Sequence, residues 1–217
     1  MNTLNVKRLS VKDVRAVDIA AQMRLDGIAY QKLEHAPWVK AYPYCPHAEF
    51  AIAYVDEAIL LHFRVEEKAV RAVAKADDEN IWEDSCVEFF VSPVDDNTYY
   101  NIECNCAGQL LVGGGNVKPD RRRSSLAVMH AIDRWASLGR TPFDTREGQT
   151  AWEVALRIPQ STFFLHDVKT LEGTAMRANF YKCGDMLPAP HFLSWNDIDS
   201  ATPNFHRPDC FGLICFQ

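Results

Sequence analysis

Long apolar runs are missing from this sequence of 217 residues. A transmembrane helix needs about 20 consecutive apolar residues, and no segment approaches that length, so we expect no membrane partner. The first residues, MNTLNVKRLSVKDV, also lack the uninterrupted apolar core of a secretory signal. We therefore expect a cytoplasmic location for the chain as written, or an extracytoplasmic one if a leader peptide was removed.

An excess of positive charge is missing too. The chain has 23 Lys and Arg residues against 29 Asp and Glu residues, which gives a formal net charge of −6. Because phosphate binding needs a basic surface, this balance argues against a nucleic-acid partner. The one basic cluster, Arg121 to Arg123, lies between GGGNVKPD and SS, a context that favours a solvated loop.

Spaced metal-ligand and nucleotide-binding motifs are also absent. The seven cysteines include no C-x-x-C pair, so we expect mostly small buried thiols in a reducing compartment. His191 and His206 belong to no H-x-x-x-H pattern, which argues against a metal site. The segment QLLVGGGNVKP lacks the Lys-Ser/Thr ending of a phosphate-binding loop. The motifs therefore predict no metal and no cofactor.

Helical periodicity is sparse, whereas alternation of apolar and polar residues dominates. The alternating segments are 49–55, 58–67, 85–93, 98–112, 150–159, 174–183 and 211–216. Turn residues separate them, which predicts one all-β domain over residues 1–217, an antiparallel β-sandwich of the jelly-roll kind. We expect residues 1–35 to form an N-terminal lead-in packed on this domain.

The strand within IWEDSCVEFFVSP places a charged residue, Glu88, in an apolar sequence. Such a residue must be exposed to solvent, paired with an opposite charge, or part of a functional site. The period of two assigns Val87, Phe89 and Val91 to the core, and it assigns Glu88 to the opposite face together with Trp82.

The following strand has its own polar set, which is Asn101, Glu103 and Asn105. Like faces of the two strands must pair, because a slip of one residue would drive carboxylates into the core. A turn near Asp95 then sets Glu88 near Asn101. The sequence therefore predicts one patch of carboxylates, amides and an indole on a single sheet face.

This patch has the chemistry of a sugar-binding surface. Carboxylates and amides supply directional acceptors and donors, while an aromatic face covers apolar C–H surface. Two other interpretations stay open. The patch could be the solvated outer face that most antiparallel sheets possess, or Glu88 could form a structural pair with Arg64 or Arg177.

Several separated motifs occur in the order found in a known family. They are AILLHFRVEE, IWEDSCVEFF, YYNIECNCAG and the closing RANFYKCGDMLPAPHFLSWNDIDSATPNFHRPDCFGLICF. Over residues 36–217 the chain resembles the family 9 carbohydrate-binding modules, and its ending is similar to that of the stand-alone members. The characterised modules are attached to xylan-degrading enzymes and recognise the reducing ends of β-glucans and xylans.

The resemblance implies a β-sandwich that grips a sugar unit between two Trp rings. Trp82 matches the first of these rings and Glu88 matches the sugar-binding acid, while Trp195 in FLSWNDI is the candidate for the second ring. The family's binding Arg is expected on the strand of Glu103 or Asn105, where this chain has none.

Two further expectations come from the same resemblance. A guanidinium could reach the patch from Arg64 or Arg177, which lie on polar strand faces. Some family members also bind calcium as a structural ion. The loop acids that could do so here are Asp77, Asp78, Asp95 and Asp96.

Two alternatives to non-catalytic sugar binding belong to other classes of function. Glu88 and Glu103 could form the carboxylate pair of a glycoside hydrolase, although no local feature singles out one of them as the proton donor. A b-type haem domain is less favoured, because the chain has no C-x-x-C-H attachment signal. Its axial candidates would be Met23, Met129, Met176 and Met186.

Overall fold

A single path of paired strands folds back on itself to make the sandwich. The computed structural model describes residues 1–116 and 120–217. The strands are β1 (Thr3–Arg8), β2 (Gln31–Lys32), β3 (His47–Val55), β4 (Ala58–Ala72), β5 (Cys86–Ser92), β6 (Tyr99–Asn105), β7 (Leu110–Gly115), β8 (Arg122–Arg123), β9 (Asp133–Ala136), β10 (Phe143–Pro159), β11 (Ala175–Cys183), β12 (Phe192–Ser194) and β13 (Gly212–Phe216). The helices are α1 (Ile19–Leu25) and α2 (Leu126–Ala131), with 3-10 turns η1 (Ala16–Asp18), η2 (Ile81–Glu83), η3 (Gln160–Thr162) and η4 (Pro208–Cys210).

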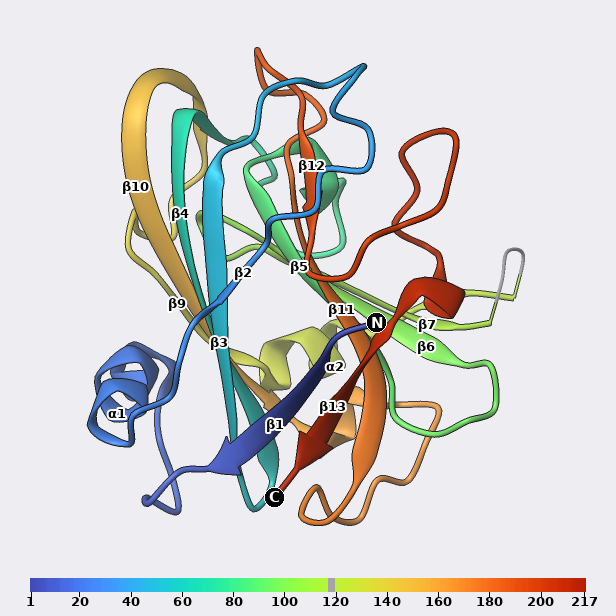
Figure 1. Ribbon diagram of the computed structural model, residues 1–217. Helices are drawn as coiled ribbons and strands as arrows, with labels where there is room; N and C mark the ends of the chain where they lie inside the picture. Colours follow the sequence, from blue (N-terminus) through green and yellow to red (C-terminus); the bar gives the residue numbers. More distant parts are fainter. Residues whose placement is uncertain (117–119) are drawn as a thin grey trace.

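Strand β1 joins the two sheets of the sandwich. The strand order is β8-β7-β6-β5-β11-β13-β1-β3-β4-β10-β9, with β12 added to β11 and β2 added to β3. Residues 3–6 of β1 pair in parallel with β13, and residues 7–8 pair in parallel with β3 (Figure 1). The sandwich is therefore mixed rather than purely antiparallel, and residues 3–8 belong to it instead of packing on it as a lead-in.

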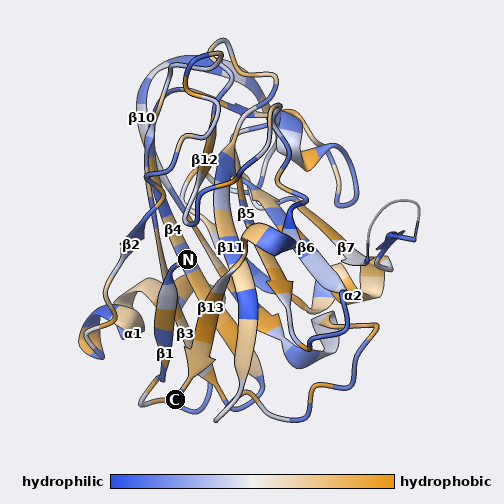
Figure 2. Cartoon of the chain, turned by 45° about the vertical axis from the view of Figure 1, so that its right-hand side comes forward, coloured by the Kyte–Doolittle hydropathy of each residue, from blue (hydrophilic) through white to orange (hydrophobic). Residues whose placement is uncertain are grey.

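Apolar side chains at alternate positions fill the space between the sheets. Phe180 on β11 stacks on Phe50 of β3 with 3.7 Å between ring centroids, and on Phe89 of β5 at 4.9 Å. Figure 2 shows hydrophobic residues gathered along the strands. A second apolar cluster, with Ile19 and Met23 of α1, covers the outer face of β3 and β4. No helix among the described residues is long and apolar enough to cross a membrane.

The predicted strands are present, with one division that the sequence analysis did not anticipate. The stretch 98–112 forms two strands, β6 and β7, joined by a tight turn. Gly108 takes a left-handed φ of 79° there, a conformation that favours glycine. The side-chain oxygen of Asn105 accepts hydrogen bonds from the backbone N–H groups of Ala107 at 3.1 Å and Gln109 at 2.9 Å. The turn reverses the chain and brings the three glycines of β7 beside β6.

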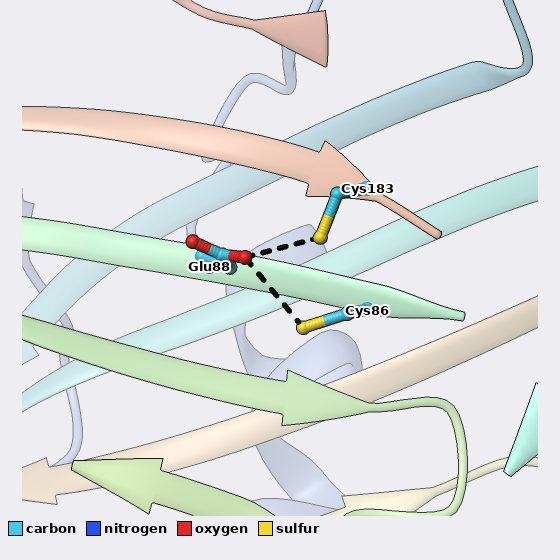
Figure 3. A group of neighbouring side chains, drawn as sticks. All are labelled: Cys86, Glu88 and Cys183. Carbon is cyan, nitrogen blue, oxygen red and sulfur yellow. Dashed lines mark hydrogen bonds between the residues drawn. The ribbon is translucent and has the colours of Figure 1, made fainter. Parts of the chain in front are cut away.

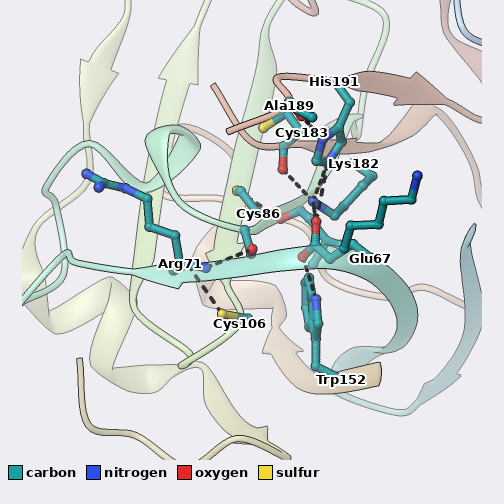
Figure 4. Close-up of polar contacts among 12 residues, drawn as sticks. Glu67, Arg71, Cys86, Cys106, Trp152, Lys182, Cys183, Ala189 and His191 are labelled. Carbon is teal, nitrogen blue, oxygen red and sulfur yellow. Dashed lines mark hydrogen bonds and ion pairs between the residues drawn. The ribbon is translucent and has the colours of Figure 1, made fainter. Parts of the chain in front are cut away.

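A buried ion pair ties the two sheets together. Lys182 Nζ on β11 lies 3.0 Å from Glu67 Oε2 on β4, and both side chains are fully buried. Trp152 Nε1–H on β10 donates to the other carboxylate oxygen at 2.7 Å. Lys182 also donates to the carbonyl oxygen of Cys183 at 2.7 Å (Figure 4). Since each charge has a direct partner, the pair can remain in the interior.

His191 completes this network as a neutral side chain. Its Nε2 lies 2.7 Å from Lys182 Nζ, which can only donate, so Nε2 is the acceptor and Nδ1–H donates to Ala189 O at 2.9 Å. Burial and the nearby Lys182 charge lower the pKa of His191 to about 2. The imidazole therefore remains uncharged in the fold at any ordinary pH.

Replacing Lys182 with Met should destabilise the protein strongly. The change leaves the Glu67 carboxylate buried without its cation, and breaking a buried pair in this way costs about 3–5 kcal/mol. Urea denaturation measures the loss in unfolding free energy. Lys169→Met, which removes an exposed cation beside Asp167, is the matched control and should leave the midpoint almost unchanged. An equally small effect of Lys182→Met would contradict the assignment of this pair as a tie between the sheets.

His191 should also give the stability a defined dependence on pH. Its pKa is lower in the folded state than the unfolded value of about 6.5, so protons bind preferentially to the unfolded chain. The stability contributed by neutral His191 is present above that value and is lost at about 1.4 kcal/mol per pH unit below it. The difference in unfolding free energy between wild type and His191→Gln should therefore shrink from pH 7 to pH 5. His130→Gln, at an exposed position, is the control, and a His191 difference that does not change with pH would refute the neutral assignment.

Candidate functional site

A cavity of about 570 Å³ opens on the outer face of the sheet that contains β5, β6, β7 and β11. Its floor comes from these strands, and its walls come from η2, β8, β12 and the segment 203–206. The lining residues are Trp82, Glu88, Phe90, Asn101, Glu103, Leu111, Gly113, Arg121, Arg122, Arg123, Cys183, Asp185, Phe192, Pro203, Asn204, Phe205 and His206. Acids, amides, guanidinium groups and aromatic rings therefore share one concave surface.

The period-two prediction for the central hairpin is confirmed, but the register differs by two residues. Glu88 pairs with Glu103, and Phe90 pairs with Asn101, whereas a turn near Asp95 would have set Glu88 beside Asn101. The connection is centred one residue later because Asn97 takes a left-handed φ of 66°. A shift of two residues keeps every side chain on its predicted face, so the acids still meet.

Asn101 connects a carboxylate to a guanidinium on the cavity floor. Its Nδ2 donates to Glu103 Oε1 at 2.9 Å, and its Oδ1 accepts from Arg121 Nη2. Burial raises the pKa of Glu103 to about 7. Among the described residues, the other Glu103 oxygen, Oε2, has no hydrogen-bond partner although it is buried. A ligand that carries a donor could satisfy it.

Glu88 is held by weak donors only. The carboxylate is 3% exposed, and among the described residues its hydrogen-bond partners are thiols. Cys183 Sγ lies 3.1 Å from Glu88 Oε1 and Cys86 Sγ lies 4.0 Å from the same oxygen (Figure 3). Burial, and then the neighbouring Glu103, raise the pKa of Glu88 well above its usual value. Strand β5 thus holds the Glu88 carboxyl group at the cavity, where its described hydrogen-bond partners are weak donors.

Arg121 to Arg123 are the functional candidates that the sequence analysis missed. Arg122 and Arg123 form β8, which pairs with Gly114 and Gly113 of β7, instead of a solvated loop. Arg121 lies 3.9 Å from the Tyr99 ring centroid and donates to the carbonyl oxygens of Tyr99 and Gly115 at 3.2 and 2.8 Å. The guanidinium groups therefore come from Arg121 and the adjoining β8, not from the strand of Glu103.

Gly113 is the local signal that could have indicated this arrangement. A Cβ at this position would lie 2.5 Å from Asn101 Oδ1, closer than any two such atoms can approach. Glycine therefore leaves room for the Asn101 side chain between β6 and Arg121. The Gly-rich strand and the Arg run that follows it belong to the same site.

Aromatic side chains stand at the rim of the cavity. Trp82 is half-buried on η2, and Arg123 lies 5.8 Å from its ring centroid. Phe205 stacks on Tyr181 with 4.2 Å between centroids, and Phe192 packs edge-on against Phe205 at 6.0 Å. Trp82 and this Phe pair line the same cavity from different segments of the chain.

A family model described as carbohydrate-binding family 9 matches residues 17–216. The chain belongs to carbohydrate-binding family 9. A Bacteroides uniformis protein proposed to bind carbohydrate is 46% identical, with a TM-score of 0.97 over 100% of this chain and 99% of that one. The search of curated proteins found no match.

More distant family 9 structures share the fold. One is a Caldicellulosiruptor kristjanssonii module in complex with glucose, 14% identical with a TM-score of 0.60 over 100% of this chain and 96% of that one. The other is a module from the same organism in complex with cellotriose, 15% identical with a TM-score of 0.56 over 100% and 94% of the two chains. At this identity the likeness shows the β-sandwich fold.

Trp195, suggested as the second family 9 ring, does not line the cavity. It is 5% exposed and packs edge-on against Phe50 at 5.9 Å and Phe180 at 5.5 Å between centroids. Its backbone N–H donates to Phe180 O at 2.9 Å, which turns the indole toward the space between the sheets. The expectation for Trp195 is therefore corrected to a core residue.

Arg64 and Arg177 do not reach the cavity either. Arg64 lies on β4, in the opposite sheet, where it pairs with Glu49 at 3.6 Å and covers the Tyr30 ring at 3.9 Å from its centroid. Arg177 is on β11 but donates to the carbonyl oxygen of Pro208 at 2.8 Å. Neither forms the pair with Glu88 that the sequence left open.

Asn105 is also outside the cavity lining. Its Nδ2 donates to Asp84 Oδ2 at 2.9 Å, while its Oδ1 closes the turn between β6 and β7. The amide is fully buried and has partners on both sides. We therefore assign it to the turn instead of a ligand surface.

The loop acids suggested for calcium do not gather into one site. Asp77 forms a two-pronged pair with Arg134 at 2.7 and 2.8 Å, Asp78 pairs with Arg123, and Asp96 pairs with His166. Over residues 1–116 and 120–217, the one group of three possible metal ligands is formed by Cys86, Glu88 and Cys183. None of the four methionines considered for haem lines the cavity.

Proposed function

We propose that this protein binds a saccharide in the cavity, without catalysis, through the floor of Glu88, Asn101 and Glu103 and the aromatic rim at Trp82. The observation that carries the proposal is the buried Glu88 carboxylate, which faces the cavity and, among residues 1–116 and 120–217, has only thiols as hydrogen-bond partners. The glucose and cellotriose complexes of the distant family 9 modules support the same class of ligand.

The cavity offers the contacts that a polyhydroxylated ring requires. Sugar hydroxyls can donate to Glu88 and to the unpartnered Glu103 oxygen, and the Arg122 and Arg123 guanidinium groups can donate to sugar oxygens. The Trp82 ring can pack against the C–H face of the sugar. The volume of about 570 Å³ falls within the usual range of about 300–1,000 Å³ for small-molecule sites.

Glycoside hydrolysis receives no comparable support. A hydrolase needs one protonated carboxyl and one ionised partner, whereas burial raises the pKa of both Glu88 and Glu103. The direction of the two pKa shifts therefore singles out neither acid as the proton donor. The Bacteroides uniformis protein and the two Caldicellulosiruptor kristjanssonii modules are described by carbohydrate binding, not by hydrolysis.

Calorimetric titration of wild type and Trp82→Ala with glucose, xylose and cellotriose tests the proposal. Loss of the ring should weaken binding about 10- to 30-fold, because an aromatic ring that packs on the ligand contributes about 1.4–2 kcal/mol. Trp135→Ala removes a half-buried ring from β9 and should bind as wild type does. Folded wild type that binds none of these sugars or any member of a glycan array, or equal affinities for wild type and Trp82→Ala, would refute the proposal.

Glu88→Gln separates binding from hydrolysis. Sugar hydroxyls that donate to Glu88 favour its ionised form, which accepts through both oxygens, whereas the amide of Gln keeps the shape but fixes one position as a donor. Sugar affinity should therefore fall at least about 10-fold. The wild type should release no product from xylan or aryl glycosides. Turnover that disappears in Glu88→Gln would instead establish the hydrolase.

A further inference from the structure

Two cysteines and a glutamate meet where β5 and β11 pair. Cys86 and Cys183 are directly opposed across the two antiparallel strands, and Glu88 lies two residues further along β5, on the same face. Cys183 Sγ and Cys86 Sγ lie 3.1 and 4.0 Å from Glu88 Oε1. All three ligand atoms lie within 4.8 Å of one another, and Figure 3 shows the three side chains converging.

We propose that Cys86, Cys183 and Glu88 form a binding site for a thiophilic divalent cation of the Zn²⁺ class, with a fourth coordination position open to the cavity. Zn²⁺ prefers thiolate, imidazole and carboxylate ligands in a tetrahedral arrangement. This inference uses Glu88 but does not rest on saccharide binding.

The spacing of the three atoms is close to the geometry of such a site. Zn–S bonds of about 2.3 Å and Zn–O bonds of about 2.0–2.2 Å, in a tetrahedron, place ligand atoms about 3.5–3.8 Å apart. The observed sulfur–oxygen distances of 3.1 and 4.0 Å lie on either side of this range. Small rotations of the side chains would bring both sulfurs to bonding distance, and each thiol would release its proton to solvent on coordination.

The surroundings leave one side of the group accessible. Glu88 and Cys183 line the cavity, whereas Cys86 lies behind them with no exposed surface. Three protein ligands with one open position are typical of zinc sites that accept an exogenous ligand. Asp185 lines the same cavity, so the cavity offers a further carboxylate as well as the space for a bound molecule.

The other buried cysteines lack this arrangement. Cys104 lies on β6 and points into the space between the sheets, where its thiol donates to the backbone oxygen of Asn105 at 3.4 Å. Cys106 donates to the backbone oxygen of Arg71 at 3.4 Å. In the part of the chain that the structure describes, neither thiol hydrogen-bonds to a carboxylate, so both stay among the buried thiols predicted from the sequence.

Titration of the chelator-treated protein with Co²⁺ and Cd²⁺, in a non-thiol reductant, tests the site directly. A thiolate-to-metal charge-transfer band should grow and saturate at one metal per chain. Cys86→Ser and Cys183→Ser should each weaken metal binding more than about 100-fold. Loss of a residue that only hydrogen-bonds a metal ligand lowers metal affinity about 10–100-fold, and loss of the ligand itself should lower it further. Cys104→Ser, at an equally buried position, is the matched control and should keep wild-type affinity, and near-ultraviolet circular dichroism checks that each variant is folded.

A wild type without the band, or a folded Cys86→Ser variant that keeps it, would overturn the proposal. Saccharide titrations run on the metal-free protein keep the two claims apart. Sugar binding without metal uptake would refute the metal site alone, while metal uptake without sugar binding would refute the proposed function alone.

Discussion

The alternation of side chains along β5 and β6 is the constraint on which both the fold and the candidate site depend. On one face, Val87, Phe89 and Ile102 enter the core between the sheets; on the other, Glu88 and Glu103 face the cavity. Because a slip of one residue would exchange these faces, the stacking of Phe89 on Phe180 also fixes which way the acids point. Packing in the core thus positions the polar floor.

Holding acids in this position opposes their ionisation. Burial raises the pKa of Glu88 and Glu103, and it raises that of Asp185 to about 6. The fold tolerates these groups because Asn101 and Arg121 orient Glu103, while the two thiols surround Glu88. The result is a set of fixed hydrogen-bonding groups with unused capacity, which a ligand can satisfy without rearranging the strands. Preorganisation of this kind reduces the ordering cost of binding.

Local pattern was sufficient to predict most of the fold, since each strand face follows from the period of two. The faces of β4, β5 and β6, and the placement of Glu88 and Glu103 on the same face, follow from that pattern alone. The register could not be obtained in the same way, because it depends on the left-handed conformation of Asn97. The parallel pairing of β1 is likewise a long-range event between the two ends of the chain.

The difference between local pattern and long-range pairing also explains why the sequence predictions for Trp195 and for Arg121 to Arg123 were wrong. Trp195 has polar neighbours in the sequence, but pairing of β12 with β11 turns its ring into the core. Arg121 to Arg123 have the composition of a solvated loop, yet two-residue pairing with β7 places them over the floor. Residues contributed by a short strand or by a distant segment have no periodic signal of their own, so only the assembled sandwich shows where they lie.

The central claim is that the outer face of β5 and β6, not the interior, is where a saccharide binds. Nuclear magnetic resonance of the ¹⁵N-labelled protein during titration with glucose tests it most directly, because each of the five tryptophans contributes its own indole N–H signal. The account predicts that the Trp82 indole and the Asn101 side-chain amide signals move, while those of the buried Trp152 and Trp195 stay in place. Movement of the Trp195 signal with Trp82 unchanged would contradict it.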